Sequence, residues 1–186
     1  MAGGAPTAGP HSFLAGGGEG HARGRDVGER GAGDGASPGL SVIYADTSAL
    51  VRAYLVDEPD HELLRYRLLE ADEPVVTSEL TRVELASAVM AAARQGRLGR
   101  PEVVLNRFDA DCADDGPVAL LRLDPVPVLQ LARELVRGHL IRTLDAIHLA
   151  VARTTAAELA AGEPLIVVTR DDRQAEVARA LGLETA

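Results

Sequence analysis

The feature that most constrains the fold is an alternation of short strand-like and longer helix-like segments, which begins at residue 41. Short runs rich in valine, isoleucine and leucine and bounded by turn residues predict strands. We expect strands at residues 41–45, 74–77, 118–123, 165–169 and 183–185. Strands that alternate with helices predict an α/β domain with a parallel sheet covered on both faces.

The helix-like segments are recognised by apolar residues spaced three and four apart and by residues typical of helix ends. They lie at residues 48–56, 61–71, 79–95, 101–113, 126–137, 144–161 and 173–181. Asp60 is expected to cap the second helix, and Thr77 or Ser78 the third. Gly96, Gly138, Gly162 and Gly182 are expected to end four of the helices.

Residues 1–40 differ from the rest of the chain. This segment contains 13 of the 19 glycines and has no hydrophobic periodicity. It cannot bury enough apolar surface to offset its ordering entropy, so we expect a disordered tail ahead of one folded domain at residues 41–186. Two explanations of the tail stay open: either native translation starts near Val42, or the extension is dispensable.

Composition narrows the class of protein. The chain has 46% hydrophobic and 25% charged residues, an ordinary globular balance, and its single cysteine, Cys112, excludes an internal disulfide. No apolar run reaches the roughly 20 residues that span a bilayer, and no secretory signal precedes the domain. We therefore expect a cytoplasmic protein. The net charge of −9 argues against a nucleic-acid partner unless the acidic residues surround a cation, which would reverse the local field.

Four acidic residues lie where a surface charge is not expected. Asp46 follows the first strand and Asp171 follows the strand at 165–169, and the carboxyl ends of parallel strands face the ligand crevice. Glu84 and Asp145 lie in helices that are apolar on most sides, which predicts burial. Buried carboxylates are unfavourable without a partner, and capping or an ion pair with Arg82 explains only some of the four.

Together these residues predict one acidic pocket. Clustered carboxylates do not all stay ionised without a cation, and a set of oxygen ligands suits Mg²⁺ or Mn²⁺. Such ions activate water and stabilise charge on a phosphoryl group. Thr47, Ser48 and Thr169 are candidates to hydrogen-bond these carboxylates or to cap helices. His148 is expected to be packed and hydrogen-bonded, and Arg142 either contacts an RNA phosphate or faces water.

The sequence around the four acids resembles PIN domains, in particular VapC toxins. The similar segments are 42–51 with Asp46, 82–85 with Glu84, 142–150 with Asp145, and 168–171 with Asp171 followed by 178–183. All four occur in the family's order and spacing, and the resemblance covers about residues 42–184. The segment around Asp145 is the most specific of the four.

The resemblance implies a three-layer α/β/α domain with a mainly parallel five-stranded sheet. It also implies an Mg²⁺- or Mn²⁺-dependent endoribonuclease, the toxin of a type II toxin–antitoxin system, that cleaves structured RNA such as tRNA or rRNA. A homodimer and a cognate antitoxin are implied as partners. By residue, Asp46 and Asp145 match the metal ligands, Glu84 matches the acid that completes the site, and Asp171, rather than its neighbour Asp172, matches the fourth acid.

Other readings of the acids are weaker. A haloacid-dehalogenase phosphatase needs a second aspartate where this chain has Ser48, and both it and a phospho-accepting receiver domain need a lysine. All 19 basic residues here are arginine. A degenerate PIN domain that only binds protein or RNA remains the alternative, and Mn²⁺-dependent stabilisation would separate it from the nuclease.

Overall fold

The computed structural model describes residues 41–186, so the expectations for residues 1–40 lie outside the described residues. The strands are β1 (Val42–Ala45), β2 (Val75–Ser78), β3 (Val118–Leu121), β4 (Leu165–Val168) and β5 (Glu184–Thr185). They form one sheet in the order β3-β2-β1-β4-β5, and every neighbouring pair is parallel. The predicted parallel sheet is thus confirmed, with β1 at its centre.

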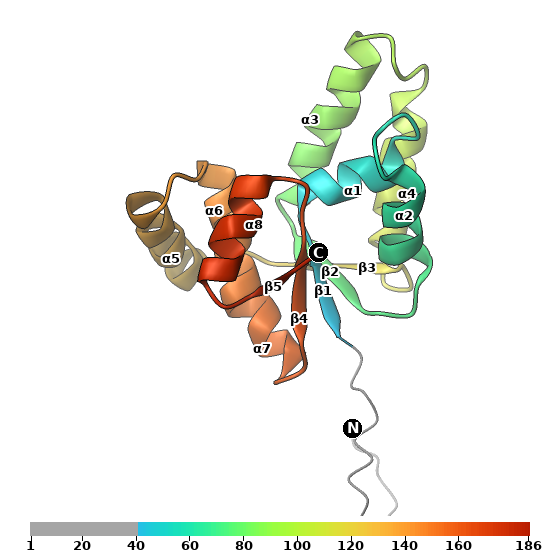
Figure 1. Cartoon of the computed structure of the whole chain (residues 1–186). Coiled ribbons are helices and arrows are strands. Elements are labelled where there is room, and N and C mark those ends of the chain that lie inside the picture. The colour runs from blue at the N-terminus through green and yellow to red at the C-terminus, as the bar shows by residue number, and fades with distance from the viewer. Residues whose placement is uncertain (1–40) are drawn as a thin grey trace, which may run out of the picture. The chain divides into compact units, whose positions relative to one another are not determined.

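Helices cover both faces of this sheet (Figure 1). The first group comprises α1 (Thr47–Tyr54), α2 (His61–Arg65), η1 (Tyr66–Glu70), α3 (Thr81–Arg94) and α4 (Pro101–Asp111). The second comprises α5 (Pro125–Gly138), α6 (Thr143–Val151), η2 (Ala152–Ala156), α7 (Ala157–Ala160) and α8 (Asp172–Ala180). The result is the expected three-layer α/β/α arrangement.

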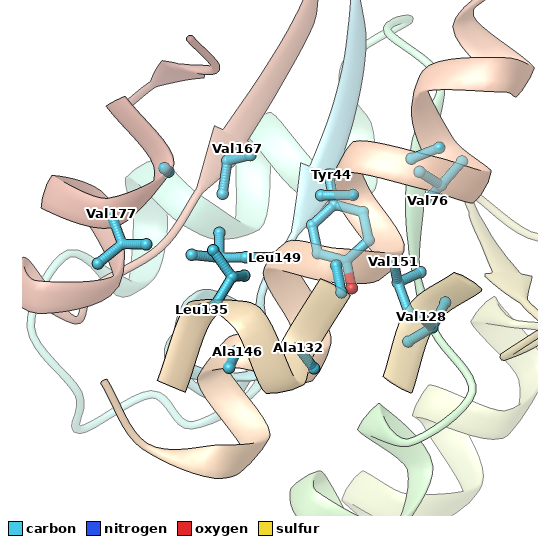
Figure 2. Packing of buried hydrophobic residues seen from close by; sticks show 14 of the residues in the cluster. Tyr44, Val76, Val128, Ala132, Leu135, Ala146, Leu149, Val151, Val167 and Val177 are labelled. Atoms are coloured by element: carbon cyan, nitrogen blue, oxygen red, sulfur yellow. The ribbon is translucent and has the colours of Figure 1, made fainter. Parts of the chain in front are cut away.

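The side chains of β1 show how the sheet packs against the helices on each of its two faces. Successive residues of a strand point to opposite faces, and all four residues of β1 are buried. Val42 and Tyr44 belong to the core shared with α5, α6 and α8, which Figure 2 shows around Leu149. Ile43 and Ala45 belong to the core shared with the first group of helices. A strand buried on both sides explains the continuous apolar run in the sequence.

Two predicted helices contain a π-helical turn. The segment predicted at 61–71 is α-helical to Arg65 and π-helical in η1, and the segment at 144–161 changes from α6 to η2 at Ala152. The hydrophobic periodicity predicted the extent of each helix correctly. One wider turn changes the angular position of the residues after it, but the apolar pattern continues.

Predictions for the helix ends had mixed outcomes. Gly96, Gly162 and Gly182 have positive φ angles of 75°, 99° and 77°, as a helix stop requires, whereas Gly138 is the last residue of α5 itself. Asp60 is the N-cap of α2 as predicted, but it adopts a left-handed conformation (φ 61°) and makes no side-chain cap bond.

The residue before α3 is Leu80, which has no capping side chain, instead of Thr77 or Ser78. Thr77 donates a hydrogen bond to the carbonyl of Ala45, and Ser78 accepts one from the Leu80 amide in the turn before the helix. Both hydroxyls therefore shape the end of β2 and the turn after it.

The order of the strands determines where a site is placed. The chain moves from β1 outward through β2 to β3, and then crosses to β4 on the other side of β1. The carboxyl ends of β1 and β4 therefore flank a topological switch point, where α/β proteins place their ligands. Within the part of the chain that the structure describes, no helix combines the length and apolar character needed to cross a bilayer.

Candidate active site

Asp46 lies at the switch point and is fixed through both its backbone and its carboxylate. Its amide donates to the carbonyl of Val168 at 2.9 Å, so the residue continues the pairing of β1 with β4. One carboxylate oxygen accepts from the Ser48 amide at 2.9 Å, which makes Asp46 the N-cap of α1. The side chain is almost fully buried, so its charge requires these partners.

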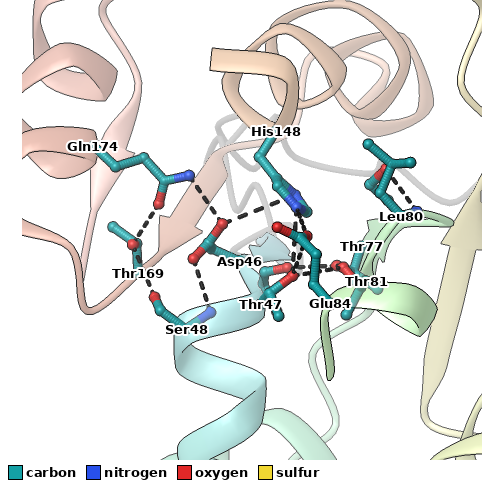
Figure 3. Close-up of polar contacts among 12 residues, drawn as sticks. Asp46, Thr47, Ser48, Thr77, Leu80, Thr81, Glu84, His148, Thr169 and Gln174 are labelled. Atoms are coloured by element: carbon teal, nitrogen blue, oxygen red, sulfur yellow. Dashed lines mark hydrogen bonds and ion pairs between the residues drawn. The ribbon is translucent and has the colours of Figure 1, made fainter. Parts of the chain in front are cut away.

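The second oxygen of Asp46 accepts a hydrogen bond from the side-chain amide of Gln174 at 2.9 Å. Gln174 is fully buried on α8, and its own carbonyl accepts a hydrogen bond from Thr169 (Figure 3). Sequence analysis did not identify this residue. A signal was present, since Gln174 occupies the first position of an apolar stripe continued by Val177 and Ala178 at helical spacing.

Glu84 is held in the same network from the other side of β1. Its carboxylate accepts a hydrogen bond from the Thr47 hydroxyl at 2.8 Å and lies 2.6 Å from Nε2 of His148. Nδ1 of His148 lies 2.9 Å from the hydroxyl of Tyr44 and 3.9 Å from the Asp46 carboxylate. The imidazole therefore joins Glu84 to the Asp46 side of the site, and the expectation of a packed, hydrogen-bonded histidine is confirmed.

The contact between His148 and Glu84 changes the pKa of both groups. Burial alone would raise the pKa of Glu84, but the hydrogen bond and charge of His148 outweigh it and lower the pKa. Burial alone would lower the pKa of His148, but its hydrogen bond to Glu84 and the nearby Asp46 charge raise it. Both shifts favour an ion pair between a carboxylate and an imidazolium.

Asp145 lies in the first turn of α6, three residues before His148. Its pKa is raised, first by partial burial and then by the negative charges of Asp46 and Asp171. Three predicted acids from three separate segments thus share one electrostatic environment. Repulsion of this kind is the condition that a bound cation relieves.

Asp171 lies beside Asp145 in the lining of an open groove of about 470 Å³. It is also the N-cap of α8, where its carboxylate accepts hydrogen bonds from the amides of Arg173 and Gln174. Asp172 lines the same groove and is more exposed than Asp171, so the choice of Asp171 stays a prediction. Asp171, like Asp46, therefore both caps a helix and belongs to the acidic site.

The donor set fits a hard divalent cation with few protein ligands. Among residues 41–186, no three carboxylate, imidazole or thiol groups are already arranged as a set of metal ligands. Mg²⁺ is commonly held by one or two carboxylates, with water and substrate phosphate completing its shell. Asp46 and Asp145, one buried and one facing the groove, suit that kind of site better than a closed protein cage.

The supporting hydroxyl residues have distinct positions. Thr47 hydrogen-bonds the Glu84 carboxylate directly, as anticipated. Ser48 contacts Asp46 through its backbone amide, while its hydroxyl accepts from the Arg170 amide at 2.9 Å. Thr169 is linked to Asp46 through Gln174, and its hydroxyl also lies 3.2 Å from that of Ser48.

The expectation that the helix around Glu84 is mostly buried was wrong. Thr81, Leu85, Val89 and Ala92 form a single buried face, and Val83 is 71% exposed. Glu84 lies at the edge of the buried face, which leaves its carboxylate accessible from the site. The alternative pairing with Arg82 does not occur, because Arg82 pairs with Asp109 at 3.4 Å.

Comparison with known proteins identifies the family. The family model described as the PIN domain matches residues 43–180. The chain belongs to the PIN-domain family.

Relatives within the family indicate which type of PIN-domain protein the chain is. Ribonuclease VapC46 of Mycobacterium tuberculosis (strain ATCC 25618 / H37Rv) is 34% identical over 144 residues, which cover 77% of this chain and 95% of the relative. Ribonuclease VapC47 of the same species (strain CDC 1551 / Oshkosh) is 36% identical over 148 residues, which cover 78% and 96%. The chain is thus of the VapC type.

A solved structure agrees at the level of the fold. The crystal structure of M. tuberculosis VapC20, a sarcin-ricin loop cleaving toxin, matches with a TM-score of 0.52 and 18% identity. The match covers 73% of this chain and 94% of VapC20. It supports the PIN fold of residues 41–186 independently of close sequence similarity.

Proposed function

We propose that this protein is a divalent-metal-dependent endoribonuclease and the toxin of a type II toxin–antitoxin pair. Its relatives are named ribonucleases, and they match over three quarters of this chain. Residues 41–186 would form the functional domain, acting in the cytoplasm. The observation that carries the proposal is the coupling of the acids near the end of β1: Asp46 and Asp171 both raise the pKa of Asp145, and His148 lies between Asp46 and Glu84.

We assign the metal to Asp46 and Asp145. A bound Mg²⁺ or Mn²⁺ supplies an activated water and stabilises negative charge on the phosphoryl group. Gln174 and the Ser48 amide occupy defined positions on the Asp46 carboxylate, which fixes the direction of its remaining lone pairs. Fixed ligands of this kind raise metal affinity, because little conformational freedom is lost on binding.

Glu84 is assigned to orient the attacking water. Its lowered pKa keeps the group ionised at neutral pH, so that it accepts a hydrogen bond from water. Thr47 and His148 hold the carboxylate from two sides, which leaves it little freedom to turn away. Asp171 is assigned to complete the negative field around the metal from the far side of the groove.

The acidic site also suggests the partners. Clustered carboxylates without a metal attract a basic segment, so we propose inhibition by an antitoxin whose chain carries such a segment. The substrate is an RNA, with tRNA and rRNA as the candidates, and the assembly is a homodimer. Isolation of the complex from native cells, followed by mass determination, tests both protein partners.

The decisive experiment is cleavage of total RNA and purified tRNA in Mg²⁺, in Mn²⁺ and in EDTA, with Asp46→Asn as the matched control. Metal-dependent cleavage that is lost in the control is expected. A protein that neither cleaves RNA nor gains thermal stability from Mn²⁺ would instead be the binding-only module. Cleavage that persists in EDTA would refute the metal assignment.

A further inference from the structure

The groove beside the candidate metal site has arginines as well as acids in its lining. Arg142 precedes α6, Arg170 follows β4, and Arg173 lies in the first turn of α8. The acids lining the same groove are Asp145, Asp171 and Asp172. Three positive groups therefore balance three negative ones, in a chain whose net charge is −9.

One of these arginines is already used by the fold. Arg170 donates to the carbonyl of Thr169 at 3.0 Å and to that of Ala186 at 3.2 Å. Its Nε also lies 3.4 Å from the carboxylate of Asp60. The guanidinium thus joins the end of β4 to two other segments and is held in place.

Arg142 and Arg173 differ in this respect. Both side chains are exposed, and within residues 41–186 neither guanidinium has an ion pair or hydrogen-bond partner. Some other arginines on this domain are ion-paired, such as Arg97 with Asp57 and Arg65 with Glu70, whereas others lie outside the groove without a salt bridge. The two unengaged guanidiniums are available to a ligand at the wall of the groove that holds Asp145.

The groove continues past Arg173. This residue also lines an adjoining depression of about 200 Å³ with His139 and Leu140. His139 is exposed, and Leu140 is 79% exposed, although large apolar side chains are usually covered. The arginine that lines the groove therefore also neighbours an aromatic ring and an aliphatic side chain that a base can pack against.

We propose that Arg142 and Arg173 form a backbone-phosphate subsite for a single-stranded polynucleotide, beside the carboxylates. Arginine suits this task, because its planar guanidinium donates two parallel hydrogen bonds to phosphate oxygens. Asp46 is buried and Asp145 partly buried, so the reacting phosphodiester has to enter the groove. A flexible single strand can enter in this way, whereas a duplex presents a rigid, wider surface.

The subsite also resolves an electrostatic difficulty. If the groove were lined by acids alone, every phosphate of an approaching polynucleotide would be repelled. A metal ion would offset the repulsion only at the phosphate that reacts. Arg142 and Arg173 offset it at the neighbouring phosphates. The inference rests on the proposed function in its choice of RNA as the strand, but the binding itself requires neither metal nor cleavage.

The test is binding of a labelled single-stranded RNA in EDTA, over a series of salt concentrations. Each phosphate contact contributes about 0.7 to the slope of log affinity against log salt. Arg142→Gln and Arg173→Gln should each reduce the slope by about 0.7 and the affinity at 0.1 M salt by about fivefold. The double variant should lose about 1.4 from the slope. Equal losses on single-stranded DNA of the same sequence are expected for contacts to phosphate.

Arg153→Gln is the matched control. Arg153 is exposed on η2, lies outside the groove lining and has no ion pair within the described residues. If the double variant binds RNA as the control does, or the parent binds no single strand, the subsite is refuted. Retained RNA binding with lost antitoxin binding would assign the arginines to a protein partner instead. Failure of the nuclease proposal is seen separately, as absence of metal-dependent cleavage by the parent.

Discussion

Replacement of Gln174 tests whether the buried amide holds Asp46 in place. Gln174→Leu keeps a similar volume and removes the hydrogen bond to the Asp46 carboxylate, 2.9 Å long in the native site. A hydrogen bond to a charged group contributes about 1.5–3 kcal/mol. For a domain of this size, each kcal/mol changes Tm by roughly 2–4 °C, so we expect Tm to fall by about 3–12 °C in the absence of metal.

Gln174→Glu is the informative companion variant. The introduced carboxyl group faces Asp46 in a buried position, so its pKa rises above the ordinary value of about 4.3. The variant should therefore approach the parent at acidic pH and lose stability as the pH rises through that raised pKa. Gln174→Leu introduces no titrating group, so it should lack the additional loss of stability that the introduced carboxyl group causes as the pH rises through its own raised pKa.

Thermal melts of the three proteins in EDTA from pH 4 to pH 8 would measure both effects. An unchanged Tm for Gln174→Leu would show that the amide does not hold Asp46. Parallel pH curves for the two variants would show that the introduced carboxyl group does not face it. If both stability results hold, the Mn²⁺ affinity of Gln174→Leu should be reduced by about 10- to 100-fold.

Three further outcomes are expected. Asp46→Asn should keep its fold, because asparagine also caps helices, and its Tm in EDTA should be no lower than that of the parent. The variant should lose both RNA cleavage and stabilisation by Mn²⁺, and near-parental cleavage would refute the mechanism. His148→Ala should lower the free energy of unfolding by about 3–5 kcal/mol, because Glu84 and Tyr44 lose their partner. His148→Gln keeps a donor for Glu84 and should lower it less. Equal losses of the two variants in urea denaturation would contradict the pairing. In EDTA the His148–Glu84 pair should stabilise the domain fully between about pH 4.5 and 6.5, the ordinary pKa values of the two groups. Its contribution should fall below that window as Glu84 is protonated and above it as His148 loses its proton, and His148→Gln should lack the alkaline loss.

Much of the fold and the four acids could be predicted because their signals are local. A buried parallel strand appears as a short apolar run, and an aspartate directly after it lies at the sheet edge wherever the neighbouring strands are. Asp46 and Asp171 follow this rule. Asp145 was apparent because a charge stands out in a helix buried on most sides.

The supporting contacts of the site could not be predicted in the same way. Gln174 and Asp46 are 128 residues apart in sequence, and the identity of an amide's partner depends on how α8 packs against β1. Asp60 shows the same limit. Its residue type predicts the N-cap position of α2 correctly, but the chain adopts a left-handed conformation there, and the carboxylate pairs with Arg52 at 3.7 Å and makes no cap bond.

The central place of β1 has a consequence for how the protein is made. Among the strands of residues 41–186, β1 is synthesised first, but β4, which pairs with it and holds the Asp46 amide, lies more than 110 residues later. Contacts between such distant segments form slowly, since a long loop must close first. A growing chain that has not reached Gln174 holds Asp46 without its amide partner and without the fourth acid. The site therefore comes together only after nearly the whole domain has been translated.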